Sequence, residues 1–173
     1  MKHLFFSIVF CSILFPANAQ KNNAASHLIA DASKMKEAFL KEDYNSFTHY
    51  THPAVLQKMG GAPKVVAVMI KTTQDMQKQG LHFSAVNFDE PSPIYTHGNE
   101  LQATIAQHLE VKVPQGKMIV TSTLIAISID KGEHWTFIDT SNKDMLTLRK
   151  ILPNLSDRII IPPTKKPEFV KGL

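Results

Sequence analysis

The spacing of apolar residues changes once along this chain, at Gly80. Before Gly80 they recur every three or four positions, which is the period of an amphipathic helix. After Gly80 they alternate with polar residues, which is the period of a strand. Helices followed by a run of antiparallel strands predict an α+β fold. This order excludes a parallel βαβ fold, because that fold requires helices and strands to alternate.

Four helices are predicted before Gly80, at residues 26–42, 44–50, 53–59 and 63–79. The first helix carries one apolar stripe, formed by Leu28, Ala32, Met35 and Phe39. Gly60-Gly61 ends the third helix, and Pro63 begins the fourth. The buried line of the fourth helix is expected at Val65, Met69, Thr72 and Met76.

Five strands are predicted after Gly80, at residues 81–88, 94–96, 101–113, 117–130 and 134–140. A bulge is expected at Ser84-Ala85, where the alternation slips. The two longest strands are rich in β-branched residues, and Pro114-Gln115-Gly116 joins them as a hairpin. Asp144 is expected to cap a short helix that ends at Leu152.

The first nineteen residues have the pattern of a secretory signal peptide. Basic Lys2 and His3 precede the apolar segment 4–15, which is too short to span a bilayer. The small residues Ala17 and Ala19 then occupy the positions that signal peptidase requires. The sequence therefore predicts cleavage before Gln20 and export to the periplasm or the medium. Three parts follow from this: a signal peptide at 1–19, an α+β domain at 20–152 and a Pro-rich tail at 153–173.

Composition excludes several classes of function for the mature chain. Cys11 is the only cysteine and lies in the signal peptide, so neither a disulfide nor a thiol nucleophile is expected. The net charge of the full sequence is +4, but the basic residues are spread along the chain and the densest pair, Lys165-Lys166, lies beside prolines. Nucleic-acid binding is not expected from this distribution. A membrane span is not expected either.

The order of elements resembles that of the nuclear transport factor 2-like superfamily, which includes polyketide cyclases, ketosteroid isomerases and dehydratases. The resemblance covers residues 24–152. It depends on the Gly60-Gly61 break before a long helix, the two long hairpin strands and the strand sequence Glu133-His134-Trp135-Thr136-Phe137-Ile138-Asp139. It implies that the N-terminal helices pack on a curved antiparallel sheet and form a cone-like roll with a pocket.

Four aromatic residues and one carboxylate are the candidate pocket residues. Tyr44 and Tyr50 lie between the first helices, near the expected mouth, while Trp135 and Phe137 share a strand face with Asp139. Trp135 is expected to be buried. Apolar surroundings would raise the pKa of Asp139 and suit a general base. Alternatively, Asp139 caps the turn that ends its strand.

Two pairs of residues could also belong to a site. His49 and His52 would share a helix face as metal ligands, but Pro53 disfavours a helical conformation at His52. We therefore expect no metal site and no organic cofactor. His108 and Glu110 alternate on one strand face and could form an acid–base unit. The opposite face of that strand is more apolar, which favours a solvent-exposed pair.

Three functions are consistent with these features. The first is an exported protein that binds a small apolar or amphipathic ligand in the pocket. The second is a homodimeric interaction module, because both faces of the strand 117–130 are apolar and helices can cover only one. The third is an isomerase or dehydratase type of enzyme with Asp139 as its base.

Overall fold

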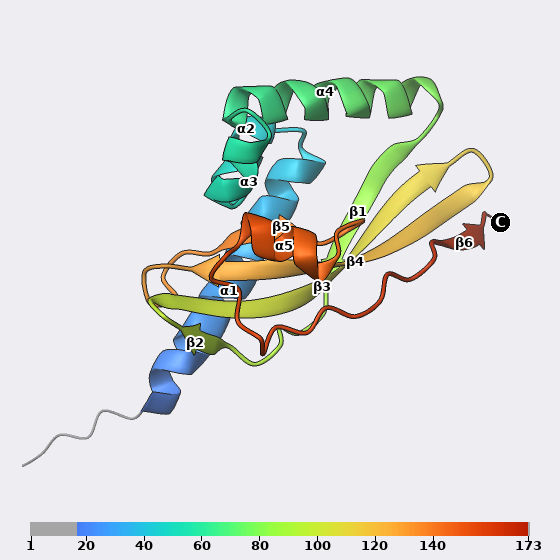
Figure 1. Ribbon diagram of the computed structural model, residues 1–173. Coiled ribbons are helices and arrows are strands. Elements are labelled where there is room, and N and C mark those ends of the chain that lie inside the picture. Colours follow the sequence, from blue (N-terminus) through green and yellow to red (C-terminus); the bar gives the residue numbers. More distant parts are fainter. Residues whose placement is uncertain (1–16, 173) are drawn as a thin grey trace, which may run out of the picture.

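The structure is a computed structural model that describes residues 17–172, with side chains from Asn23 onward. Its elements in chain order are α1 (Ala17–Leu40), α2 (Tyr44–His49), α3 (Pro53–Lys58), α4 (Ala62–Lys78), β1 (His82–Phe88), β2 (Tyr95–His97), β3 (Glu100–Val113), β4 (Gly116–Ser128), β5 (Thr136–Asp139), α5 (Met145–Ile151) and β6 (Glu168–Lys171) (Figure 1). Most of the predicted signal peptide, residues 1–16, lies outside the described residues. The predicted cleavage position before Gln20 falls in the first turn of α1.

The predicted α+β class is confirmed, since helices α1–α4 precede an open antiparallel sheet in the order β1-β3-β4-β5. Strand β2 pairs with β3, and β6 pairs with β4. The long hairpin keeps one register from Leu101 opposite Ser128 to Val113 opposite Gly116. The predicted bulge is present, because the register of β1 shifts between Phe83 and Ala85. Within residues 17–172, no helix is long and apolar enough to cross a membrane.

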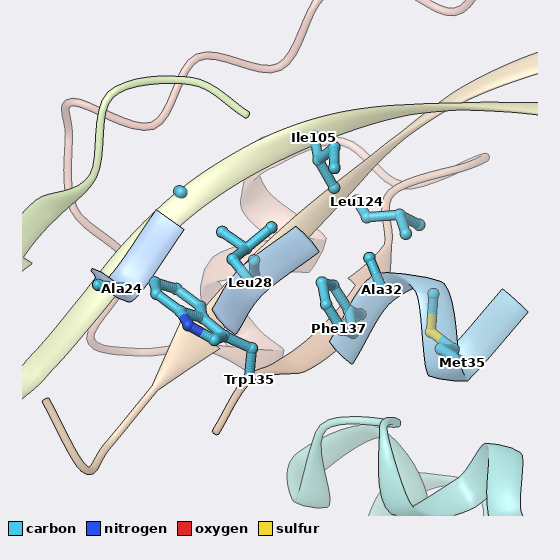
Figure 2. Packing of buried hydrophobic residues seen from close by; sticks show 10 residues of the cluster. Ala24, Leu28, Ala32, Met35, Ile105, Leu124, Trp135 and Phe137 are labelled. Atoms are coloured by element: carbon cyan, nitrogen blue, oxygen red, sulfur yellow. The ribbon is translucent and has the colours of Figure 1, made fainter. Parts of the chain in front are cut away.

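Helix α1 packs on one face of the sheet, here called the inner face. Its stripe is buried at Leu28, Ala32 and Met35, as predicted. Figure 2 shows these side chains gathered with Trp135 and Phe137 between the helix and the strands. The small residues Ala103 and Ala126 belong to the same cluster and let the helix lie close to the sheet. Trp135 is 1% exposed, so its predicted burial is confirmed.

Helix α4 follows the predicted buried line only in part. Val65 is buried as expected and Met69 and Met76 are half-buried, but Thr72 is exposed and Thr73 is buried in its place. The hydroxyl oxygens of Thr73 and Tyr44 lie 2.6 Å apart, which ties α4 to α2. The sequence could not show which threonine is buried, because positions 72 and 73 both continue the helical spacing from Val65. The hydroxyl of Tyr44, which contacts Thr73, distinguishes them.

The opposite, outer face of the sheet is covered by the C-terminal part of the chain. Ile125, Ile127 and Ile138 form a second core, to which α5 and the segment after it contribute Leu148, Leu152, Leu155 and Ile159. In Figure 1, α5 and α1 lie on opposite sides of the sheet. The apolar outer face that suggested a homodimer is therefore partly packed within the chain. The homodimer itself stays a prediction.

The buried indole of Trp135 gives the first test of this core. We expect Trp135→Ala to lower the free energy of unfolding by about 3–5 kcal/mol, because it leaves a large cavity under α1. Ile160→Ala is the matched control, since Ile160 is 77% exposed, and it should cost less than about 0.5 kcal/mol. Urea unfolding followed by circular dichroism measures both. Similar small losses for the two variants would contradict the placement of Trp135.

Candidate functional site

An apolar cavity of about 400 Å³ lies between the helices and the inner face of the sheet. Helices α1, α2, α3 and α4, the loop residues beside them, and strands β1, β3, β4 and β5 all contribute side chains to its wall. Those residues are Met35, Lys36, Phe39, Phe47, Thr51, Val55, Met59, Val65, Met69, Phe83, Val86, Gln107, Leu109, Leu124, Phe137, Ile138, Asp139 and Lys143. Thirteen of these eighteen side chains are apolar, so the wall is suited to an apolar guest.

Helix α1 builds one wall with the last turns of its apolar stripe. Met35 is buried in the α1 core and also lines the cavity, and Phe39 lies one turn further on. The ring of Phe39 lies 4.8 Å from that of Phe83 and 5.8 Å from that of Phe47, between ring centres. These tilted aromatic contacts hold α1, α2 and β1 together at this end of the cavity.

Strand β5 joins the helical layer to the sheet through backbone hydrogen bonds. The Phe137 N–H donates to the Tyr50 carbonyl at 2.7 Å, and the His52 N–H donates to the Phe137 carbonyl at 3.0 Å. The segment from Tyr50 to His52 thus pairs with β5 as a short parallel bridge. Thr51, at the centre of this pairing, and Val55, which follows it on α3, both line the cavity.

Asp139 and Lys143 lie together in the turn that follows β5. The Asp139 side chain is exposed and accepts a hydrogen bond from the Ser141 N–H at 2.8 Å. The Lys143 ammonium donates to the backbone carbonyls of Asp139 at 2.9 Å and Ser141 at 3.2 Å. The expected desolvation of Asp139 was therefore wrong. The strand-end turn places its carboxylate in water, and the turn-capping alternative describes its geometry.

The other candidate pocket residues have different surroundings. Phe137 lines the cavity, whereas Trp135 lies in the adjoining core and donates its indole N–H to the Gly132 carbonyl. Tyr44 is buried against Thr73, and Tyr50 packs half-buried against the α1 core. Of the five candidates, the structure brings Phe137 and Asp139 together at the cavity.

His49 and His52 lie on separate elements. Helix α2 ends at His49, which is exposed, and the His52 ring accepts a hydrogen bond from the Ala54 N–H at 3.2 Å as the N-cap of α3. Burial lowers the pKa of His52 below its usual value, and the charge of Glu100 opposes this only in part. Among the described residues, no three His, Cys, Asp or Glu side chains are placed to hold a metal ion.

His108 and Glu110 have separate partners and lie on the outer side of β3, away from the cavity. The two ring nitrogens of His108 contact the Thr121 hydroxyl at 3.1 Å and the Asp89 carboxylate at 3.0 Å. Glu110 forms an ion pair with Lys117 at 2.8 Å. The two residues therefore do not form an acid–base unit with each other.

Sequence reasoning missed most of the cavity wall. Met69 was assigned to the buried line of its helix, whereas Val55, Met59, Lys36 and Lys143 were not singled out. One signal was present, since flexible methionines on facing helices often line adaptable apolar sites. Comparison of the sequence with models of known protein families and with functionally characterised proteins finds no match.

The pH dependence of stability tests the burial of His52, whose backbone N–H pairs with β5. A lowered folded pKa means that the unfolded chain binds the proton more readily, so stability should fall as the pH drops below about 6.5. His52→Asn keeps an N-cap acceptor but removes this titration. Urea unfolding at pH 7.5 and 5.5 should show a larger loss for the wild type than for the variant.

His134 also contributes to the pH dependence of stability, with the opposite sign to His52, and the comparison with His52→Asn cancels this contribution. Asp130 raises the pKa of His134, so the His134 pair stabilises the fold as the pH falls and loses this effect at higher pH. Both proteins retain that pair, and the difference between them isolates His52. An identical pH dependence in the two proteins would contradict the burial of the His52 ring.

Proposed function

We propose that this protein is an exported binding protein that holds a small apolar or amphipathic molecule in the inner cavity. The observation that carries the proposal is the cavity itself, with a volume of about 400 Å³ and a wall of mostly apolar side chains. This volume falls within the range of about 300–1,000 Å³ that is usual for small-molecule sites. Binding needs only such a wall and a few orienting polar groups.

We further propose that the domain is a cone-like roll of the nuclear transport factor 2-like kind. Three features support it: helices precede the sheet, α1 crosses the inner face, and Trp135, directly before β5, packs against α1. A cone of this kind would place its pocket between the helices and the inner sheet face, where the cavity of this chain lies.

The two alternative functions have less support. A homodimer through the sheet would need an uncovered outer face, and α5 with the segment after it already covers Ile125 and Ile127. An isomerase or dehydratase would need Asp139 as a free base at the cavity. Its carboxylate is exposed and already accepts a hydrogen bond from the Ser141 N–H, and the other charged side chains of the cavity wall are those of Lys36 and Lys143.

A neutral fluorescent probe, N-phenyl-1-naphthylamine, tests the cavity directly. We expect the purified protein to bind it with enhanced emission, and Met69→Trp to weaken binding by about tenfold or more because the larger ring fills the cavity. Val68→Trp is the matched control on the same helix, since Val68 is 46% exposed and outside the cavity wall. Equal effects of the two substitutions, or a protein that does not bind the probe, would contradict the proposal.

Export is tested by expression with the complete N-terminal segment. Signal peptidase should remove residues 1–19, because they combine a basic start, a short apolar segment and small residues before the cut. N-terminal sequencing of protein from the periplasm or the medium should then begin at Gln20 or its cyclised form. Protein that keeps Met1 and stays in the cytoplasm would overturn this proposal.

A further inference from the structure

We infer that the ligand of the cavity is an amphiphile with an anionic head group. Its apolar chain would fill the cavity, and its head group would contact the ammonium groups of Lys143 and Lys36. This inference rests on the proposed binding function and adds the chemical class of the ligand to it.

The cavity wall has more cationic than anionic side chains, and its cations are not ion paired within the described part of the chain. Lys36, Lys143 and Asp139 are the charged residues that line it. The Asp139 carboxylate is engaged by the Ser141 N–H. Neither lysine forms an ion pair with another described residue, whereas Lys34, on the same helix as Lys36, is paired with Asp31 at 3.0 Å. The wall thus carries two cationic groups and one carboxylate, a net charge of +1, and neither lysine is held in an ion pair with Asp139.

Lys143 is held in position at the cavity. Two of its ammonium hydrogens point to the carbonyl oxygens of Asp139 and Ser141, at 2.9 and 3.2 Å. An ammonium group has three donors, so one remains for a ligand. The carbonyl dipoles orient the group without cancelling its charge. A carboxylate or phosphate that accepts the third hydrogen would form a charge-assisted hydrogen bond, which is stronger than a neutral one.

Lys36 reaches the cavity from α1. It follows Met35 directly, and its half-buried side chain lines the cavity. Lysine commonly lays its aliphatic stem along an apolar surface while its ammonium stays in water. This arrangement allows Lys36 to cover an apolar chain in the cavity and to meet a head group at the opening. A neutral head group would gain less from these two lysines, and a cationic one would be repelled.

Three amphiphiles that share a ten-carbon chain and differ in their head group test the inference. Decanoate and decyltrimethylammonium, each below its micellar concentration, and decanol, below its solubility limit, would compete with N-phenyl-1-naphthylamine for the purified protein. We expect decanoate to compete about tenfold more strongly than decanol, as a charge-assisted hydrogen bond allows, and decyltrimethylammonium to compete most weakly. The advantage of decanoate should shrink at high salt.

Substitutions assign this preference to the two lysines. Lys143→Met and Lys36→Met should each lower the affinity for decanoate several-fold and leave that for decanol within about twofold. Lys143→Arg, which keeps the charge, should retain most of the preference. Lys150→Met is the control, because Lys150 belongs to α5, which packs on the outer face of the sheet and does not line the cavity.

The outcomes separate this inference from the proposed function. If decanol and decanoate compete equally, or if decyltrimethylammonium competes best, the anionic head group is wrong while the binding function stands. A preference for decanoate that survives both lysine-to-methionine substitutions would also overturn the inference. If neither the probe nor any amphiphile binds, the proposed function itself fails.

Discussion

A buried carboxylate on α1 fixes the helix against the sheet, and the cavity depends on that placement. Asp31 is 5% exposed and accepts a hydrogen bond from the Trp135 backbone N–H at 3.0 Å. Its other oxygen accepts from Lys34, which supplies the opposite charge that a buried carboxylate needs. The bond joins the middle of α1 to the start of β5. Because α1 is held there, its next two turns carry Met35 and Phe39 to the cavity rather than into a closed core.

The outer face depends on a second buried polar side chain, Gln102. Its amide nitrogen donates to the Asn154 carbonyl at 2.8 Å, and its amide oxygen accepts from the Ser156 N–H at 2.9 Å. Gln102 is completely buried, so replacing it by an apolar residue would leave those two backbone groups unpaired. These two hydrogen bonds join the segment after α5 to β3 and explain how the start of the predicted Pro-rich tail packs on the sheet. Later in the tail, β6 pairs with β4 although all four residues of β6 are exposed.

Local patterns predicted the elements better than the site. The stripe of α1, the hairpin and the burial of Trp135 follow from periodicity and turn chemistry. The break before α4 also follows, because Gly60 and Gly61 have φ angles of 90° and 96°, which favour glycine. The cavity could not be found in this way, since its wall is assembled from eight helices and strands and their loops. Asp31 was missed because a polar residue beside an apolar stripe normally faces water, and its partner is a backbone group 104 positions away.

An apolar cavity of this size is maintained against a tendency to collapse. Its apolar wall would be more stable if the side chains closed on one another, since burial of apolar surface is favourable. Several polar and aromatic contacts resist that closure: the Tyr44–Thr73 contact between α2 and α4, the Phe39 contacts with Phe47 and Phe83, and the pairing of Tyr50 and His52 with β5. A ligand that fills the cavity removes the same apolar surface from water without moving these elements. Binding to the folded state alone would add about 2.7 kcal/mol of stability at a hundred times the dissociation constant. These contacts therefore hold the cavity open, and under the proposed binding function its occupancy and the stability of the fold would be linked.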